Sequence, residues 1–307
     1  MRDLSLRALN RTLLERQFLL SRDSRPALGV IERLVAPQSL EPNWPYIGLW
    51  ARSSEFHTED LMWLLTTRQV VRAAGSDVRW LRPTIQPVLD RGAQSRYFIS
   101  ETSGVDVCEL IAGGVSLLGR NTLSRREKWP GRNGRLLAAA LGLRVPLVHS
   151  PGLSAWGRWG SPSYVDVARA EPVIGAVSDS AQPERMIRRS LGGFGPATVM
   201  DFHCRPGLTK NGVDLRSDAA GSSRLSHGRG GRAVRSTEST LADGDLPAPV
   251  RFLPGYDNVL PDHALRTRIV SDEDRRQVMP GGAVDARPSS LAVSSPAFGP
   301  CKDRGCL

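Results

Sequence analysis

One cation and two large aromatic side chains fall within four residues of the sequence, at Trp156, Arg158 and Trp159. They stand in a glycine-rich segment between two apolar runs, 145–148 and 164–165, whose pattern predicts the strands of a hairpin. An aromatic ring can stack on a base or sugar, and a guanidinium can pair with a phosphate. The pattern predicts a nucleic-acid contact on this hairpin loop. A tryptophan pair that covers its own hairpin is an equally good interpretation.

The sequence offers little for metal, redox or covalent chemistry. Its four cysteines are far apart or at the C-terminus, and its histidines have no ligand spacing. We expect no metal site, no disulfide framework and no cofactor. His263, with Asp257 and Arg266 nearby in sequence, is expected to belong to a local hydrogen-bond cluster.

The charge balance favours a polyanionic partner. Lys and Arg number 41 against 31 Asp and Glu, a formal net charge of +10. Nucleic acid is the first expectation and an anionic membrane the second. The N-terminus lacks the apolar region of a signal peptide, and no apolar run reaches the ~18 residues of a membrane span. A cytoplasmic protein with no membrane association is therefore expected.

Helical periodicity is clearest in the first seventy residues. Apolar side chains recur at helical spacing after Ser5, again after Pro26 until Pro37, and from Thr58 to Leu65. The β-prone pair Val70 and Val71 follows. Helices in quick succession before a strand are typical of a winged helix. Only eight residues separate Val71 from an apparently helical stretch at Trp80, so the wing of this first unit (1–96) is expected to be truncated.

The same order repeats further along the chain. A second winged-helix unit (97–170) is predicted from helices at 105–118 and 134–143, a basic segment at 124–128, and the hairpin already described. A partial third unit (171–204) starts its helix at Pro183. Residues 205–246 are almost without large apolar side chains and predict a disordered, low-complexity linker. An ordered segment (247–282) and a disordered tail (283–307) follow. The predicted class is mainly α with small β-hairpins, as tandem winged helices with incomplete first and third units.

Five strings in a fixed order carry a family resemblance. They are LRALNR at 6–11, QSLEPNWPYIGLW at 38–50, WGRW at 156–159, FGPAT at 194–198, and RFLPGYDN at 251–258 with His263 and Arg266. Together they resemble the bacterial winged-helix DNA glycosylases that unhook interstrand crosslinks. The resemblance implies a double-stranded DNA partner and hydrolysis of the N-glycosidic bond of an N7-alkylated purine, without a metal.

The resemblance also implies where the chemistry takes place. The family carries Gln-x-Gln or Gln-x-Asp just before its Pro-Asn-x-Pro-Tyr block, and the matching positions here are Gln38 and Leu40. Leucine has neither donor nor acceptor, so it cannot hold the attacking water. Gln38 is therefore the sole candidate catalytic residue. The alternative is a structural polar residue at the end of the second helix, and for 42–50 a packing role is favoured over a DNA-facing turn.

Further departures from the family pattern predict a degenerate member. The β-hairpin expected after Val71, part of the basic segment before Trp129 and half of the third unit are missing by sequence. The leading interpretation is a DNA-binding, DNA-repair glycosylase-like protein, expected to be weak or inactive as an enzyme and monomeric. An active monofunctional glycosylase and a decayed, poorly folding product are the alternatives. The candidate DNA contacts are Arg7, Arg11, Arg33, Arg132, Arg135, Trp156, Arg158 and Trp159.

Overall fold

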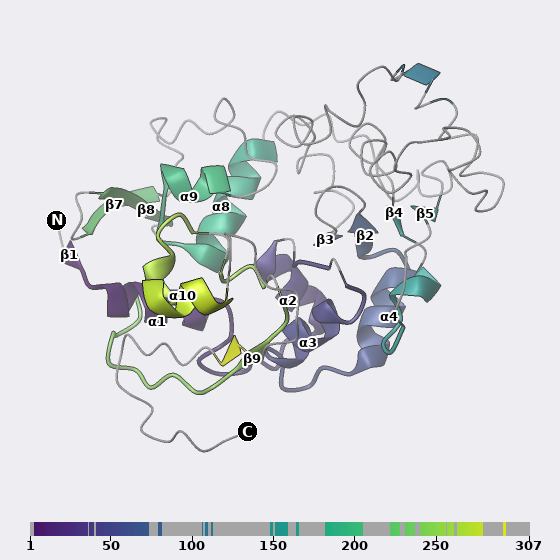
Figure 1. Cartoon of the computed structure of the whole chain (residues 1–307), viewed down its shortest axis with the longest axis horizontal. Helices are drawn as coiled ribbons and strands as arrows, with labels where there is room; N and C mark the ends of the chain where they lie inside the picture. Colours follow the sequence, from purple (N-terminus) through teal and green to yellow (C-terminus); the bar gives the residue numbers. More distant parts are fainter. Residues whose placement is uncertain are drawn as a thin grey trace.

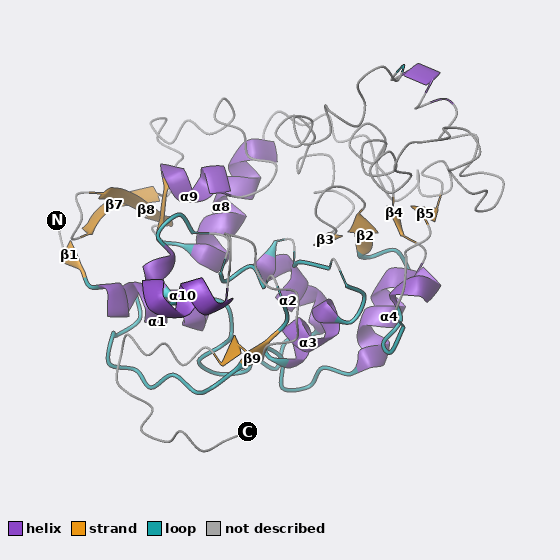
Figure 2. Cartoon of the chain, in the orientation of Figure 1, coloured by secondary structure: helices purple, strands orange, loops and turns teal. Residues whose placement is uncertain are grey.

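Helices supply most of the regular structure in the computed structural model, and its strands are short (Figures 1 and 2). The structure describes residues 3–35, 37–39, 41–73, 79–81, 106, 108–109, 112, 148–149, 151–158, 164–165, 182–204, 222–227, 231–236, 240–255, 257–260, 263–278 and 291–292. The mainly helical class with small hairpins is confirmed. The predicted helices of the second unit lie outside the described residues, apart from isolated positions. The winged-helix units and their boundaries stay predictions.

Three of the N-terminal helices agree with their periodicity. Helix α1 (Leu6–Arg16) begins at Ser5, whose Oγ accepts a hydrogen bond from the Ala8 N–H at 3.1 Å. Helix α2 (Ala27–Leu34) follows Pro26, and α4 is Thr58–Thr66. The apolar faces of α2 and α4 pack into one cluster that includes Val30, Ile31, Leu61, Leu64 and Leu65. Helix α1 contributes Leu13 and Leu14 to a second cluster.

Residues 44–50 form a helix that the sequence did not predict. Helix α3 (Trp44–Trp50) has Pro45 in its first turn, where a missing N–H costs nothing. Trp44, Tyr46 and Leu49 are buried, whereas Trp50 is exposed. The packing interpretation of this block is therefore confirmed.

One sheet joins the first hairpin to the second. Strands β2 (Val71–Ala73) and β3 (Arg79–Leu81) pair antiparallel, so a hairpin is present after Val71 where none was expected, and Trp80 lies in a strand rather than a helix. Strands β4 (Val148–His149) and β5 (Tyr164–Val165) form the predicted second hairpin. Because β2 also pairs with β4, the sheet order is β3-β2-β4-β5. Five residues separate the two strands in sequence, so the short spacing did not exclude a hairpin.

A second sheet uses part of the chain that was expected to be disordered. Strands β7 (Ser222–His227) and β8 (Gly231–Ser236) form an antiparallel hairpin. Strand β8 pairs with β6 (Ala197–Thr198), and β7 pairs in parallel with β1 (Asp3–Leu4). The expectation of disorder is thus wrong for these strands. The backbone hydrogen bonds between paired strands need few apolar side chains. The glycines at 228, 230 and 231 are typical of a hairpin connection, and the expectation of disorder did not take them into account.

The C-terminal segment returns to the N-terminal helices. It contains β9 (Phe252–Leu253), the 3-10 helix η5 (Arg266–Arg268) and α10 (Asp272–Val278), and β9 pairs with β10 (Leu291–Ala292) inside the tail expected to be disordered. Helices α8 (Gln182–Phe194) and α9 (Val199–Cys204) complete this side of the molecule with α1 and α10 (Figure 1). Helices α2, α3 and α4 lie beside the other sheet. No helix among these described elements has the length and apolar character to cross a bilayer.

A buried ion pair holds the C-terminal segment against α3. The Arg52 guanidinium donates to both carboxylate oxygens of Asp257, at 2.9 and 2.7 Å, and the two side chains are 1% and 5% exposed. Arg52 also donates to the Gly48 carbonyl and, at 3.3 Å, to Gln17 Oε1. Gln17 in turn donates to the Gly193 carbonyl of α8. The Arg52 guanidinium therefore connects the ends of α1 and α3 with the C-terminal segment, and Gln17 extends this network to α8.

A second buried cluster centres on Asp201 of α9. Its carboxylate accepts hydrogen bonds from the Thr198 and Ala264 N–H groups at 2.7 and 2.8 Å, and lies 3.6 Å from His263 Nδ1 and 3.9 Å from Arg268. Burial by itself raises the pKa of Asp201, but the hydrogen bond and charge of His263, with the charge of Arg268, hold it well below its usual range. The predicted local cluster of His263 with Asp257 and Arg266 is wrong, because His263 pairs with Asp201 and Asp257 with Arg52.

Removing one partner of the Arg52–Asp257 pair should destabilise the whole fold. We predict that Asp257→Ala lowers the free energy of unfolding by about 3 to 5 kcal/mol, because it leaves a buried guanidinium without its carboxylate. The matched control is Asp272→Ala, which breaks the exposed Asp272–Arg275 pair and should cost less than about 1 kcal/mol. Urea unfolding measures both. Equal losses for the two variants would contradict the central role of Asp257.

Asp201 should make stability depend on pH under acid conditions. A folded-state pKa below the unfolded value of about 3.9 stabilises the fold above that pH, and this stability is lost as pH falls towards the folded-state pKa. We predict that Asp201→Asn is less stable than the native chain at pH 6, and that the gap narrows by pH 3. Urea unfolding across this range tests it, with exposed Asp245→Asn as the control. A difference in unfolding free energy between the native chain and Asp201→Asn that stays constant from pH 6 to pH 3 would refute the prediction.

Candidate nucleic-acid interface

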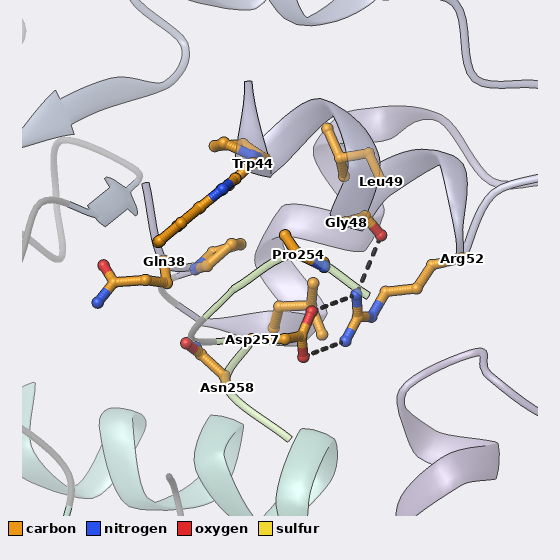
Figure 3. Close-up of a pocket in the computed structure, with 11 residues that line it drawn as sticks. Gln38, Trp44, Gly48, Leu49, Arg52, Pro254, Asp257 and Asn258 are labelled. Atoms are coloured by element: carbon orange, nitrogen blue, oxygen red, sulfur yellow. Dashed lines mark hydrogen bonds and ion pairs between the residues drawn. The ribbon is translucent and has the colours of Figure 1, made fainter. Parts of the chain in front are cut away.

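An open pocket lies where the end of α2, helix α3 and the C-terminal segment meet (Figure 3). It encloses about 320 Å³, its open mouth included. The bidentate Arg52–Asp257 pair forms one wall, so the ion pair that supports the fold also shapes this pocket. The lining residues are Leu34, Pro37, Gln38, Trp44, Pro45, Gly48, Leu49, Arg52, Pro254, Asp257 and Asn258.

Gln38 lines this pocket, in a segment that we term the glutamine segment (Pro37, Gln38 and Ser39). Its side chain is half-buried, and its Oε1 accepts a hydrogen bond from the Ser39 N–H at 3.1 Å. In Figure 3 the amide group extends away from the Arg52–Asp257 pair. The amide nitrogen of Gln38 can donate, and its oxygen has a second lone pair, so it can still orient a water molecule. Leu40 lies outside the described residues.

Arg72 of β2 links the glutamine segment to the second hairpin. Its Nε and one terminal nitrogen donate to the Ser39 carbonyl at 3.1 and 2.8 Å. Its other terminal nitrogen lies 3.5 Å from the Ser154 hydroxyl, in the 3-10 helix η3 (Pro151–Ser154). Arg72 is only 1% exposed. A single buried side chain thus contacts two segments that are more than a hundred residues apart in sequence.

The Pro-Asn-x-Pro-Tyr block holds the loop that carries the tryptophan and arginine. We term Trp156, Gly157 and Arg158 the tryptophan tip. The Asn43 amide donates to the Arg158 carbonyl at 3.0 Å and accepts from the Gly157 N–H at 2.8 Å. The tip bends at Gly157, whose φ of +77° favours glycine. Asn43 therefore pairs with the tip as a neighbouring strand would.

Tyr46 holds the same loop through its hydroxyl group and its ring. Its hydroxyl donates to the Ser154 carbonyl at 2.8 Å, and its ring centroid lies 5.6 Å from that of Trp156. Burial raises the pKa of Tyr46, so the phenol stays protonated and remains a donor. Trp156 nevertheless remains 52% exposed, and Arg158 is exposed as well. The tip presents an aromatic ring and a cation to solvent on a firmly attached loop.

The other predicted DNA contacts differ in how accessible they are. Arg11 is buried and donates to the Leu246 carbonyl and to Asn10 Oδ1, so its role is structural and the expectation of a phosphate contact is not supported. Arg7 donates to the Gly244 carbonyl and lies 3.6 Å from Asp245. Arg33 is half-buried and donates to the Arg16 carbonyl. Arg132, Arg135 and Trp159 lie outside the described residues.

Sequence reasoning missed most of the residues that support this site. Arg52, Arg72 and Asn43 are ordinary polar residues in sequence, and their partners are distant in the chain. The one available signal was that two arginines interrupt apolar stretches, at Trp50–Ser53 and Val70–Ala73. Such residues are seldom buried unless paired.

The described residues contain no group of three or more metal-binding side chains.

Comparisons with known proteins agree with the resemblance. Residues 31–292 match the sequence model of a family described as DNA glycosylase AlkZ-like. The solved structure of the Streptomyces sahachiroi DNA glycosylase AlkZ has a similar fold, with a TM-score of 0.62 and 18% identity over 92% of this chain and 84% of that one. No match is found among curated proteins. Since the family match spans most of the sequence, the chain belongs to the AlkZ-like DNA glycosylase family.

Proposed function

We propose that this protein binds double-stranded DNA through the tryptophan tip, beside the Gln38 pocket, and is a weak N7-alkylpurine glycosylase. One observation carries the proposal: Arg72 joins the glutamine segment to the loop of the tip, so one buried side chain links the candidate water-holding group to the candidate DNA contact. Members of a DNA glycosylase family act on DNA, and that is the partner proposed for this chain.

The proposed reaction needs only modest help from the protein. An N7-alkylated purine carries a positive charge, so it leaves readily once a water molecule attacks the sugar carbon. A Gln-x-Gln pair would orient that water from two sides, whereas here Gln38 acts alone because position 40 is leucine. A positioned acid–base group typically contributes about 10² to 10⁴ in rate. We therefore propose that DNA binding persists while base release is slow.

Full activity is the second candidate, and one feature of the fold favours it. One sequence argument against it was the missing first hairpin, yet β2 and β3 pair in the structure. A hairpin at this place in the chain supports access to a damaged base from the groove or after flipping. The described core is also well packed around two apolar clusters, which argues against the third alternative of a decayed, poorly folding product.

The proposal also covers the way the protein binds its DNA partner and its location in the cell. A net charge of +10 supports electrostatic binding to the DNA backbone by a monomer, with winged-helix units along the duplex. Among the candidate cations that the structure describes, Arg158 is the best placed, because its neighbour Trp156 is exposed and its carbonyl is held by Asn43. A DNA partner supports a cytoplasmic location, which is part of the same proposal.

Restoring the second glutamine should restore base release. On a duplex with one N7-methylguanine, we predict that Leu40→Gln releases the base about 10²-fold faster or more than the native chain, as expected for a regained water-positioning group. Single-turnover kinetics at saturating protein measure it, so that affinity does not enter. The control is Gln38→Ala in the Leu40→Gln background, which should return release to the native rate. Equal rates for native and Leu40→Gln proteins would overturn the proposed cause of weak activity.

The salt dependence of DNA binding distinguishes the contribution of Arg158 from that of Trp156. We predict that Arg158→Ala reduces the slope of log affinity against log salt by about 1, because one phosphate contact is lost. Trp156→Ala should weaken binding at every salt concentration without changing the slope, since stacking is not ionic. The control is Arg276→Ala on α10, an exposed cation on the other side of the molecule. If Arg276→Ala lowers the slope of log affinity against log salt as much as Arg158→Ala does, the placement of the interface at the tryptophan tip is contradicted.

A further inference from the structure

Arg72 is buried unusually deeply for a charged side chain. Its side chain is 1% exposed, and a guanidinium in the interior costs free energy unless its donors are satisfied. The structure satisfies them with the Ser39 carbonyl, twice, and with the Ser154 hydroxyl. An apolar side chain of similar length would fill the space at lower cost if packing were the only need.

The acceptors of Arg72 are what distinguish it. Ser39 directly follows Gln38, and Ser154 is two residues before Trp156. The planar guanidinium fork can hold both acceptors in one fixed geometry, which a lysine ammonium cannot reproduce. Asn43 and Tyr46 attach the tip to α3, but Arg72 is the side chain that contacts both the glutamine segment and η3.

We propose that Arg72 is a positioning residue that fixes the glutamine segment relative to the tryptophan tip. It acts through the Ser39 carbonyl on one side and through Ser154 on the other. The Gln38 amide and the exposed Trp156 and Arg158 therefore keep one spacing. Its consequence for DNA rests on the proposed function: a duplex held by the tip would present the sugar carbon to Gln38 at a set distance.

Hydrogen exchange of the free, full-length chain tests the linkage without DNA. We predict that Arg72→Lys speeds exchange by about five- to ten-fold at the Ser39 amide and at the Gly157 amide together, the factor expected for one lost hydrogen bond. The matched control is Arg268→Lys, an equally buried arginine that donates to the Pro196 carbonyl. It should leave both amides unchanged. Acceleration at only one amide, at neither, or equally in the control would overturn the proposal.

Two further variants keep the test decisive. Tyr46→Phe removes the Tyr46–Ser154 bond but leaves Arg72 on Ser39, so it should loosen Gly157 while Ser39 stays protected. Loss of protection at Ser39 in this variant would show that α3, and not Arg72, transmits the coupling. If Arg72→Lys does not fold, Ser154→Ala removes one acceptor only, and the same paired acceleration, smaller in size, is expected. Its absence would overturn the proposal equally.

A double-mutant cycle with DNA gives the functional consequence. If Arg72 positions the tip, Arg72→Lys combined with Trp156→Ala should bind duplex DNA within about two-fold of the weaker single variant. Arg268→Lys combined with Trp156→Ala should instead show multiplied losses. Multiplied losses for the Arg72 pair would refute its action on the tip. If the native chain does not bind the duplex in the same titration, the proposed function fails, while hydrogen exchange still decides the role of Arg72.

Discussion

The bidentate ion pair between Arg52 and Asp257 is the interaction on which the rest of the structure depends. It joins α3 to a segment two hundred residues later in the chain, and through Gln17 and the Gly193 carbonyl it reaches α1 and α8. Both partners are buried, so the Coulomb attraction must offset a large desolvation cost, and the remaining lone pairs and protons need partners. Gly48, Gln17 and the Val259 N–H supply several of them. The Gln38 pocket exists because this pair closes one side of it.

Around that pair, the candidate interface is held together mainly by polar side chains that form hydrogen bonds with backbone groups. Asn43 pairs with the backbone on both sides of the bend at Gly157, and Tyr46 and Arg72 secure η3. The block between the glutamine segment and α3 is therefore a docking element for the second hairpin. None of these contacts uses a polar group at position 40, and the proposed function therefore separates DNA binding from base release.

Local signals predicted part of the fold, and long-range pairing decided the rest. Helices α1, α2 and α4 and the β4–β5 hairpin follow from apolar periodicity and caps, so the sequence contained them. The β2–β3 and β7–β8 hairpins are stabilised largely by backbone ladders, which leave little trace in composition. Gln38 and the tip were named as candidates from the sequence, whereas Arg72 was not and Asp257 was assigned to the wrong partners. The true partners of both residues are distant in sequence, and no local pattern records such a pairing.

The central claim is that a DNA-binding scaffold has lost most of its base-release chemistry at one position. The most direct measurement follows binding and base release in the same sample, with native protein at saturating concentration on a duplex containing N7-methylguanine at low salt. The account predicts a fully bound duplex in which the alkylated base is still attached long after binding is complete. Rapid formation of abasic sites as the complex forms would contradict it, and so would a duplex that stays unbound.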